Sequence, residues 1–206
     1  MIKTLTYEVY TVDESSPDAL ERAHMDYLSD GDYYYWADES ISTLREFEDI
    51  FPVRVRDYDC GYNNYVNFEM YYCFEDEVYD FTGTRLAKWL WNNYRDRLYK
   101  GKYYSTPGKY VDDKYTYKSR HSKIILDNCC PLTGYCADDA ILEPIYKFMA
   151  SPDNYQTPED IMNDCLQSWV YACRDDVDAS ESLESFIDTA QANEWTFTKE
   201  GKLWTL

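Results

Sequence analysis

The sequence predicts an α+β fold: mixed helices with a small antiparallel sheet, a mainly helical C-terminal third and a closing hairpin. Helical periodicity dominates the last third, short alternating segments occur earlier, and no regular strand–helix–strand repeat is present. The 206 residues suit a domain of ordinary size. We therefore expect a single α+β domain over 1–206, with a subdivision into 1–127 (α+β) and 128–206 (mainly helical) as the alternative.

Patterns between Met1 and Asp80 predict two helices and several strands. Ser16-Pro17-Asp18 is typical of a helix start, because it supplies a cap, a proline at the first helical position and an acid in the first turn. Alternating apolar residues indicate the strands. The expected elements are a strand at 2–12, helices at 17–28 and 41–50, paired strands at 53–58 and 65–74, and a third strand ending near Tyr79.

The rest of the chain is expected to be mostly helical. Thr82 should cap a helix that runs to about Lys100, because apolar residues between Leu86 and Leu98 form one stripe. A loop is then expected at 101–113 and a strand at 115–127. The remaining expected elements are helices at 137–150 (interrupted or shifted by Pro144), 157–172 and 180–192, and a hairpin of 195–198 and 203–206.

Charge is the most informative feature of the sequence. The 39 acidic and 20 basic residues give a net charge of −19. Residues 1–50 hold thirteen acids and three bases, and residues 151–206 hold twelve and three. Between these ends, residues 85–123 carry eleven bases and three acids. Because the mean field is negative, we do not expect general affinity for DNA, RNA or anionic lipid.

The sequence carries no complete catalytic, cofactor or membrane signature. The seven glycines match no dinucleotide-binding or P-loop spacing, and only two histidines are present. No segment approaches the roughly 20 apolar residues of a membrane span, and the start lacks the apolar core of a signal peptide. An odd number of cysteines, with Cys129 and Cys130 adjacent, fits a reducing compartment. We expect a cytoplasmic, non-enzymatic protein with no cofactor and no membrane contact.

The expected partner-binding residues lie in the acidic ends. Consecutive aromatic rings at 33–36 cannot all face one core, and tyrosine favours binding surfaces. Helical carboxylates at three- and four-residue spacing could occupy Lys and Arg rows that otherwise hold phosphates. The expected contacts are Asp30, Asp32, Tyr33, Tyr34, Tyr35, Trp36, Asp38 and Glu39, with Asp160, Asp164, Asp175 and Asp176 as a second arm.

The leading hypothesis is a non-catalytic inhibitor that mimics nucleic acid and blocks the basic groove of a DNA- or RNA-binding enzyme. The composition is similar to that of small acidic inhibitors carried by phages and mobile elements, such as anti-restriction and anti-CRISPR proteins. An ordinary solubilising surface is the competing explanation of the same acidity. Homo-oligomer formation is left open.

Two alternatives involve other parts of the chain. Basic residues interleaved with tyrosines at 85–123 are typical of a single-strand nucleic-acid groove, although the overall charge opposes direct binding. The cysteines supply enough ligands for a zinc-stabilised module, although free cysteine is more often simply buried. The candidate zinc ligands are Cys129, Cys130 and Cys136, with His121 or with Cys165 and Cys173.

Overall fold

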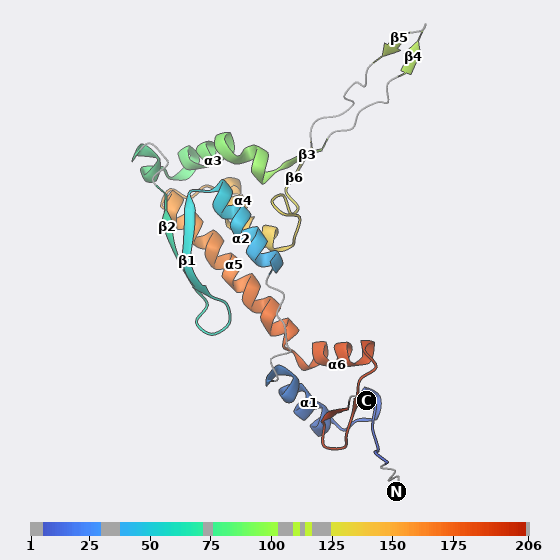
Figure 1. Cartoon of the computed structure of the whole chain (residues 1–206). Helices are drawn as coiled ribbons and strands as arrows, with labels where there is room; N and C mark the ends of the chain where they lie inside the picture. The colour runs from blue at the N-terminus through green and yellow to red at the C-terminus, as the bar shows by residue number, and fades with distance from the viewer. Residues whose placement is uncertain are drawn as a thin grey trace. The chain divides into compact units, whose positions relative to one another are not determined.

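The computed structural model describes residues 6–29, 38–71, 76–102, 109–111, 114–116 and 125–204 (Figure 1). Within these ranges six α-helices accompany four two-stranded antiparallel sheets, which confirms the predicted α+β class. The chain divides into two compact units, which we describe separately. Unit 1 combines residues 1–36 with 174–206, and unit 2 is residues 37–173. These boundaries do not coincide with a subdivision at residue 127.

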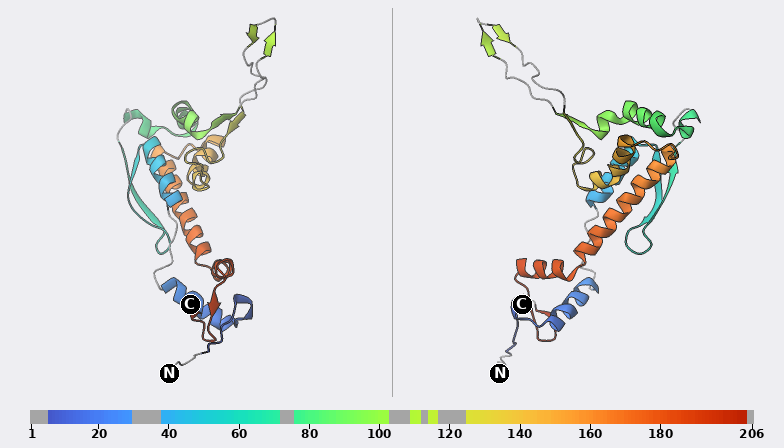
Figure 2. Two further views of the ribbon diagram at one scale, coloured as in Figure 1. Left: turned by 45° about the vertical axis from the view of Figure 1, so that its right-hand side comes forward. Right: turned by 180° about the vertical axis from the view of Figure 1, so that it is seen from behind.

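Unit 1 is built from the two ends of the chain. Its elements are the 3-10 helix η1 (Val12–Glu14), α1 (Pro17–Ser29), the last turns of α5 (Pro158–Ser180), α6 (Leu183–Ala192) and the hairpin of β7 (Thr196–Phe197) with β8 (Leu203–Trp204) (Figure 2). Tyr10 and Phe197 exchange backbone hydrogen bonds of 2.9 and 2.8 Å, which fastens the first segment to the closing hairpin. The buried core of unit 1 consists of Val12, Ala23, Phe186, Ala190 and Phe197.

Most of the elements expected in unit 1 are confirmed. α1 and α6 lie close to the predicted helices, and the hairpin forms as predicted. The expected strand at 2–12 is wrong over its described part, because Tyr10 forms one isolated bridge and η1 begins at Val12. A local interaction favours the 3-10 helix η1 over a strand, since both the backbone N–H and the hydroxyl of Thr11 donate to the Glu14 carboxylate. Residues 2–5 lie outside the described residues.

Unit 2 is organised around the long helix α5. Its other main elements are α2 (Asp38–Ile50), β1 (Val53–Asp59), β2 (Tyr65–Met70), η2 (Asp76–Asp80), α3 (Gly83–Leu98) and α4 (Ala137–Ala150). Trp169 of α5 is buried, and its indole N–H donates to the Ser40 carbonyl at 2.9 Å. The ring of Tyr58 meets that indole edge-on at 5.0 Å, so the β1–β2 hairpin lies beside α5 (Figure 1).

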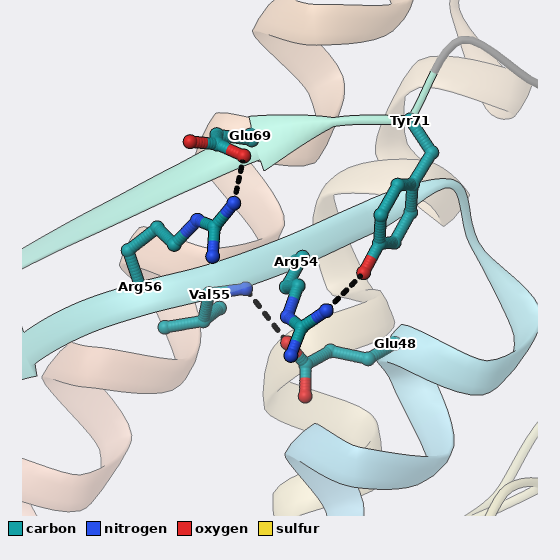
Figure 3. A network of polar contacts seen from close by, with 6 residues as sticks. All are labelled: Glu48, Arg54, Val55, Arg56, Glu69 and Tyr71. Atoms are coloured by element: carbon teal, nitrogen blue, oxygen red, sulfur yellow. Dashed lines mark hydrogen bonds and ion pairs between the residues drawn. The ribbon is translucent and has the colours of Figure 1, made fainter.

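β1 and β2 form a hairpin where the sequence predicts one, with one bulge at Arg56. β2 ends at Met70, earlier than the predicted end at residue 74, because Tyr71 lies outside the strand. Figure 3 shows the polar contacts of this hairpin. The backbone N–H of Val55, next to the bulge, donates to Glu48 of α2 at 2.7 Å. Arg56 pairs with Glu69 across the hairpin, and both side chains are exposed. The expected third strand near Tyr79 is wrong, because residues 76–80 form the 3-10 helix η2.

Residues 100–127 contain short pairings that the sequence did not predict. β3 (Lys100–Lys102) pairs with β6 (Ile125–Asp127), and β4 (Lys109–Val111) pairs with β5 (Lys114–Thr116). The expected loop at 101–113 is therefore wrong in the parts that the structure describes, because residues 101–102 belong to β3 and residues 109–111 belong to β4. Three-residue strands carry too little alternation to be recognised locally. The middle of the strand expected at 115–127 lies outside the described residues.

Pro144 does not interrupt α4, contrary to the prediction. A proline lacks the N–H that would bond to the carbonyl four residues earlier, here Ala140. The Ser168 hydroxyl of α5 donates to that carbonyl at 2.8 Å. The neighbouring helix thus satisfies the acceptor that proline leaves open. α5 itself matches a predicted helix but ends at Ser180, later than expected.

Candidate functional site

Unit 1 concentrates the negative charge of the protein. It holds sixteen acids and five bases, a net charge of −11. Unit 2, which spans most of the chain, holds twenty-three acids and fifteen bases, a net charge of −8. Residues 1–36 and 174–206, the outer parts of the two acidic ends, are far apart in the sequence but belong to one unit, whose charge density is well above that of the rest.

Many carboxylates of unit 1 lie on exposed helical positions. Asp18 and Glu21 are exposed on α1, and Glu184 and Asp188 are exposed on α6, at three- and four-residue spacing. Exposed acids also occur in the last turns of α5, at Asp175, Asp176 and Asp178. Among the described residues of unit 1, Arg174 with Asp175 is the one ion pair between side chains. The remaining carboxylates of this described surface therefore stand outside ion pairs.

A cavity of about 680 Å³ opens in the same unit. Four aromatic residues line it: Tyr27, Phe186, Trp195 and Phe197. The Tyr27 ring lies 5.4 Å from that of Phe186 and 5.7 Å from that of Trp195. Asp26 and Lys202 also line the cavity, so an aromatic interior is combined with polar groups. Such a cavity can accept an apolar or cationic side chain of a partner.

The structure brings together only some of the predicted contact residues. Asp175 and Asp176 belong to unit 1, whereas Asp38, Glu39, Asp160 and Asp164 belong to unit 2. All six are exposed. The predicted contacts Asp30, Asp32, Tyr33, Tyr34, Tyr35 and Trp36 lie outside the described residues.

Two of the predicted contacts in unit 2 have local structural partners. The Asp160 carboxylate accepts hydrogen bonds from the backbone N–H of Thr157 at 2.9 Å and from its hydroxyl at 2.7 Å. These bonds lower the pKa of Asp160. Asp164 accepts a bond of 3.0 Å from the Gln156 amide. Both carboxylates thus take part in the start of α5.

Sequence reasoning missed the aromatic cavity. Its lining comes from α1, α6 and the β7–β8 hairpin, which belong to opposite ends of the chain. Tyr27 and Phe186 look like ordinary apolar positions on two amphipathic helices. No local signal connects them, and only the pairing of the chain ends creates the site.

The described part of the basic segment presents cations on α3. Arg85, Lys88, Arg95 and Arg97 are all exposed. The Arg85 guanidinium lies 3.7 Å from the centre of the Phe81 ring, and Arg95 pairs with its neighbour Asp96. The side chains of the remaining bases, from Lys100 to Lys123, are not among those described.

Within the described part of the chain, the cysteines do not gather into the four-ligand sets expected from the sequence. Cys165 and Cys173 are buried on α5, and burial raises the pKa of Cys165. His121 lies outside the described residues. Cys129 and Cys130 instead meet Asp139, with all three candidate ligand atoms within 4.8 Å of one another. Desolvation, a hydrogen bond with Cys129 and the charge of Asp139 raise the pKa of Cys130 to about 12.

Comparison with known proteins identifies no relative of this chain. No family model matches the chain, and neither curated proteins nor solved structures provide a significant match. Across the described helices, none is both long and apolar enough to cross a membrane.

Proposed function

We propose that this chain is a non-catalytic interaction protein whose unit 1 binds the basic, nucleic-acid-binding surface of a partner protein. The supporting observation is that residues 1–36 and 174–206, from opposite ends of the chain, belong to one unit of net charge −11. A surface that binds DNA presents rows of Lys and Arg that match the duplex charge. Exposed helical carboxylates that stand outside ion pairs can occupy such rows, and the binding excludes the nucleic acid.

The aromatic cavity would supply the part of the affinity that charge does not. Screened surface ion pairs contribute little each, so charge alone favours fast association more than tight binding. A partner side chain inserted among Tyr27, Phe186 and Trp195 would bury apolar area at the centre of the interface. An Arg or Lys side chain suits the cavity, because its stem is apolar and its cation can lie on aromatic rings near Asp26. Enzymes that cut or bind DNA, including restriction and CRISPR nucleases, are the partner class that such a surface fits.

The proposal is tested by competition with DNA. Immobilised full-length protein is mixed with lysate at low salt, retained proteins are eluted by a salt step, and each is assayed for binding to a duplex. We expect at least one eluted protein to bind DNA and to lose that DNA as this protein is added, more weakly at high salt. Retained proteins that bind no DNA, or whose DNA binding is unaffected by this protein, would contradict the proposal.

Direct binding of nucleic acid is the second candidate, and the exposed basic face of α3 favours it. Arg85, Lys88 and Arg95 recur at three- and seven-residue intervals, which places them on one side of the helix. Filter binding of the purified protein to single-stranded DNA or RNA at low salt separates the two proposals. Retention of the nucleic acid supports the second candidate, and no retention supports the first.

A further inference from the structure

The geometry points to a zinc site formed by Cys129, Cys130 and Asp139, between β6 and the first turn of α4. The Sγ atoms of the two cysteines lie 3.8 Å apart. The Sγ atom of Cys130 lies 3.6 Å from Oδ2 of Asp139. Sequence spacing alone does not identify this site, because an adjacent cysteine pair is no recognised zinc motif and the carboxylate lies nine residues further along.

Two of the three separations between the ligand atoms match the edges of a tetrahedral zinc site. Zinc binds thiolate sulfur at about 2.3 Å and carboxylate oxygen at about 2.0 Å, in tetrahedral geometry. Two thiolates on one ion then lie about 3.8 Å apart, and a thiolate and an oxygen about 3.5 Å apart. These two edges, 3.8 and 3.6 Å, therefore already suit the ion, and the third, between Cys129 and Asp139, is within 4.8 Å. Two sulfurs and one oxygen also suit zinc better than the hard cations Mg²⁺ and Ca²⁺, which prefer oxygen ligands only.

The backbone around the three ligands is held in position before any ion binds. The Cys130 N–H donates to Oδ1 of Asp139 at 2.8 Å, which leaves Oδ2 directed at the sulfur. The Cys129 N–H donates to Asp127 at 3.2 Å. Cys130 adopts a φ of 42°, a left-handed conformation that is uncommon for a residue with a side chain. Backbone strain of this kind is often retained at functional sites, where it holds a side chain in a required direction.

The fourth coordination position would face solvent. Cys129 and Asp139 line a cavity of about 470 Å³, together with Glu143, Tyr146 and Lys147. Lys147 and Glu143 form an ion pair of 2.9 Å at this cavity. A water molecule or a small anion can therefore complete the tetrahedron. Binding would replace the two thiol protons with one ion and fix the connection between β6 and α4.

The site is tested on the full chain, purified under reducing conditions, stripped of metal and titrated with Co²⁺. We expect a thiolate-to-cobalt charge-transfer band, d–d bands of tetrahedral intensity and displacement of the cobalt by one equivalent of Zn²⁺. Because loss of an outer-shell partner alone weakens metal binding by roughly 10–100-fold, Cys129→Ser, Cys130→Ser and Asp139→Asn should each weaken it at least roughly tenfold. Asp139→Asn keeps an oxygen for the Cys130 N–H, and circular dichroism confirms that each variant folds.

Cys136→Ser is the matched control, because Cys136 is exposed nearby but lies outside the three-residue cluster. We expect its cobalt spectrum and zinc affinity to equal those of the unaltered protein. The proposal is overturned if no band develops, or if Cys129→Ser and Cys130→Ser leave the band unchanged. It is also overturned if Cys136→Ser abolishes the band. The same holds if Cys129 and Cys130 bind no metal and only form a disulfide with each other in air.

Discussion

The hydroxyl of Thr43 in α2 donates a hydrogen bond of 2.8 Å to the buried carboxylate of Asp138 in α4. The same carboxylate accepts from the Thr133 hydroxyl and from the backbone N–H groups of Leu132, Thr133 and Gly134, at 2.7–2.9 Å. Asp138 is fully buried, so it serves as the shared acceptor for α2 and for the segment that leads into α4. A buried carboxylate is tolerated here because its hydrogen bonds replace those of water.

Asp138→Ala should therefore be strongly destabilising. The substitution removes the acceptor of three backbone N–H groups and of two hydroxyls, and we expect the free energy of unfolding to fall by about 2–4 kcal/mol. Thr43→Val removes one of the donors and should cost about 1 kcal/mol. Urea denaturation followed by circular dichroism measures both losses. The exposed control Asp49→Asn should change the stability by less than about 0.5 kcal/mol, and an equally small effect of Asp138→Ala would contradict the assignment.

Ser168→Ala should lower the stability of the protein, because it removes the donor that compensates for the proline in α4. Ser168 donates to the Ala140 carbonyl, which has no N–H partner at Pro144. Loss of the hydroxyl leaves this carbonyl unpaired, at a cost of about 1–2 kcal/mol in unfolding free energy. In a Pro144→Ala background the helix supplies its own N–H, so the same serine substitution should cost less. A double-mutant cycle by urea denaturation measures the difference, and two fully additive substitutions would disprove the coupling.

Gly201→Ala should disturb the packing of the β7–β8 turn on α1. Gly201 has a φ of +86°, and a Cβ atom there would lie 2.2 Å from the Ala19 carbonyl oxygen of α1. Because that oxygen belongs to the backbone, we expect a loss of at least about 2 kcal/mol in stability. Gly134→Ala is the control, since its φ of +96° is similar but a Cβ meets no atom within 4 Å. In thermal unfolding, the melting temperature of Gly201→Ala should be clearly lower than that of Gly134→Ala. Equal losses would mean that the positive φ alone, and not the contact with Ala19, destabilises the two variants.

The sequence predicts those parts of the fold that local signals determine. The start of α5 is recognisable from Thr157 and Pro158, and the apolar stripe of α3 is recognisable from its spacing, because capping and periodicity act within a few residues. The β3–β6 pairing and the burial of Asp138 depend on contacts between distant segments, and neither has a local signature. The negative charge was evident from composition. Its concentration in one unit depends on which segments fold together, which spacing does not reveal.

Neutralising the acids of α6 should weaken partner binding more than neutralising acids elsewhere. Glu184→Gln with Asp188→Asn removes two exposed carboxylates of unit 1, and each exposed charge contributes about 0.2–1 kcal/mol. We expect the partner affinity to fall about 2- to 30-fold, with a shallower dependence on salt. Asp49→Asn with Asp80→Asn removes two exposed carboxylates of unit 2 and is the matched control. Equal losses in the two variants would show that net charge, and not the surface of unit 1, governs binding.

The cap of α5 should make its stability depend on pH. Thr157 and Asp160 form a reciprocal cap, since the Asp160 N–H also donates to the Thr157 hydroxyl at 3.2 Å. The pKa of Asp160 is lower in the folded protein than its ordinary value of 3.8, so the folded state binds this proton less readily than the unfolded chain. The stabilisation is therefore fully present above that ordinary value, and it is lost as the pH falls through the folded-state pKa.

Asp160→Asn should accordingly cost about 1 kcal/mol in unfolding free energy at pH 7, and the difference from the unaltered protein should shrink towards pH 3. Urea denaturation at several pH values measures this convergence. Glu159→Gln removes a charge from the same helical turn, and we expect a smaller loss of about 0.3–0.5 kcal/mol from the helix dipole alone. If Asp160→Asn costs the same at pH 3 as at pH 7, the stabilisation does not depend on the charge of the carboxylate, and the expected pH dependence is wrong.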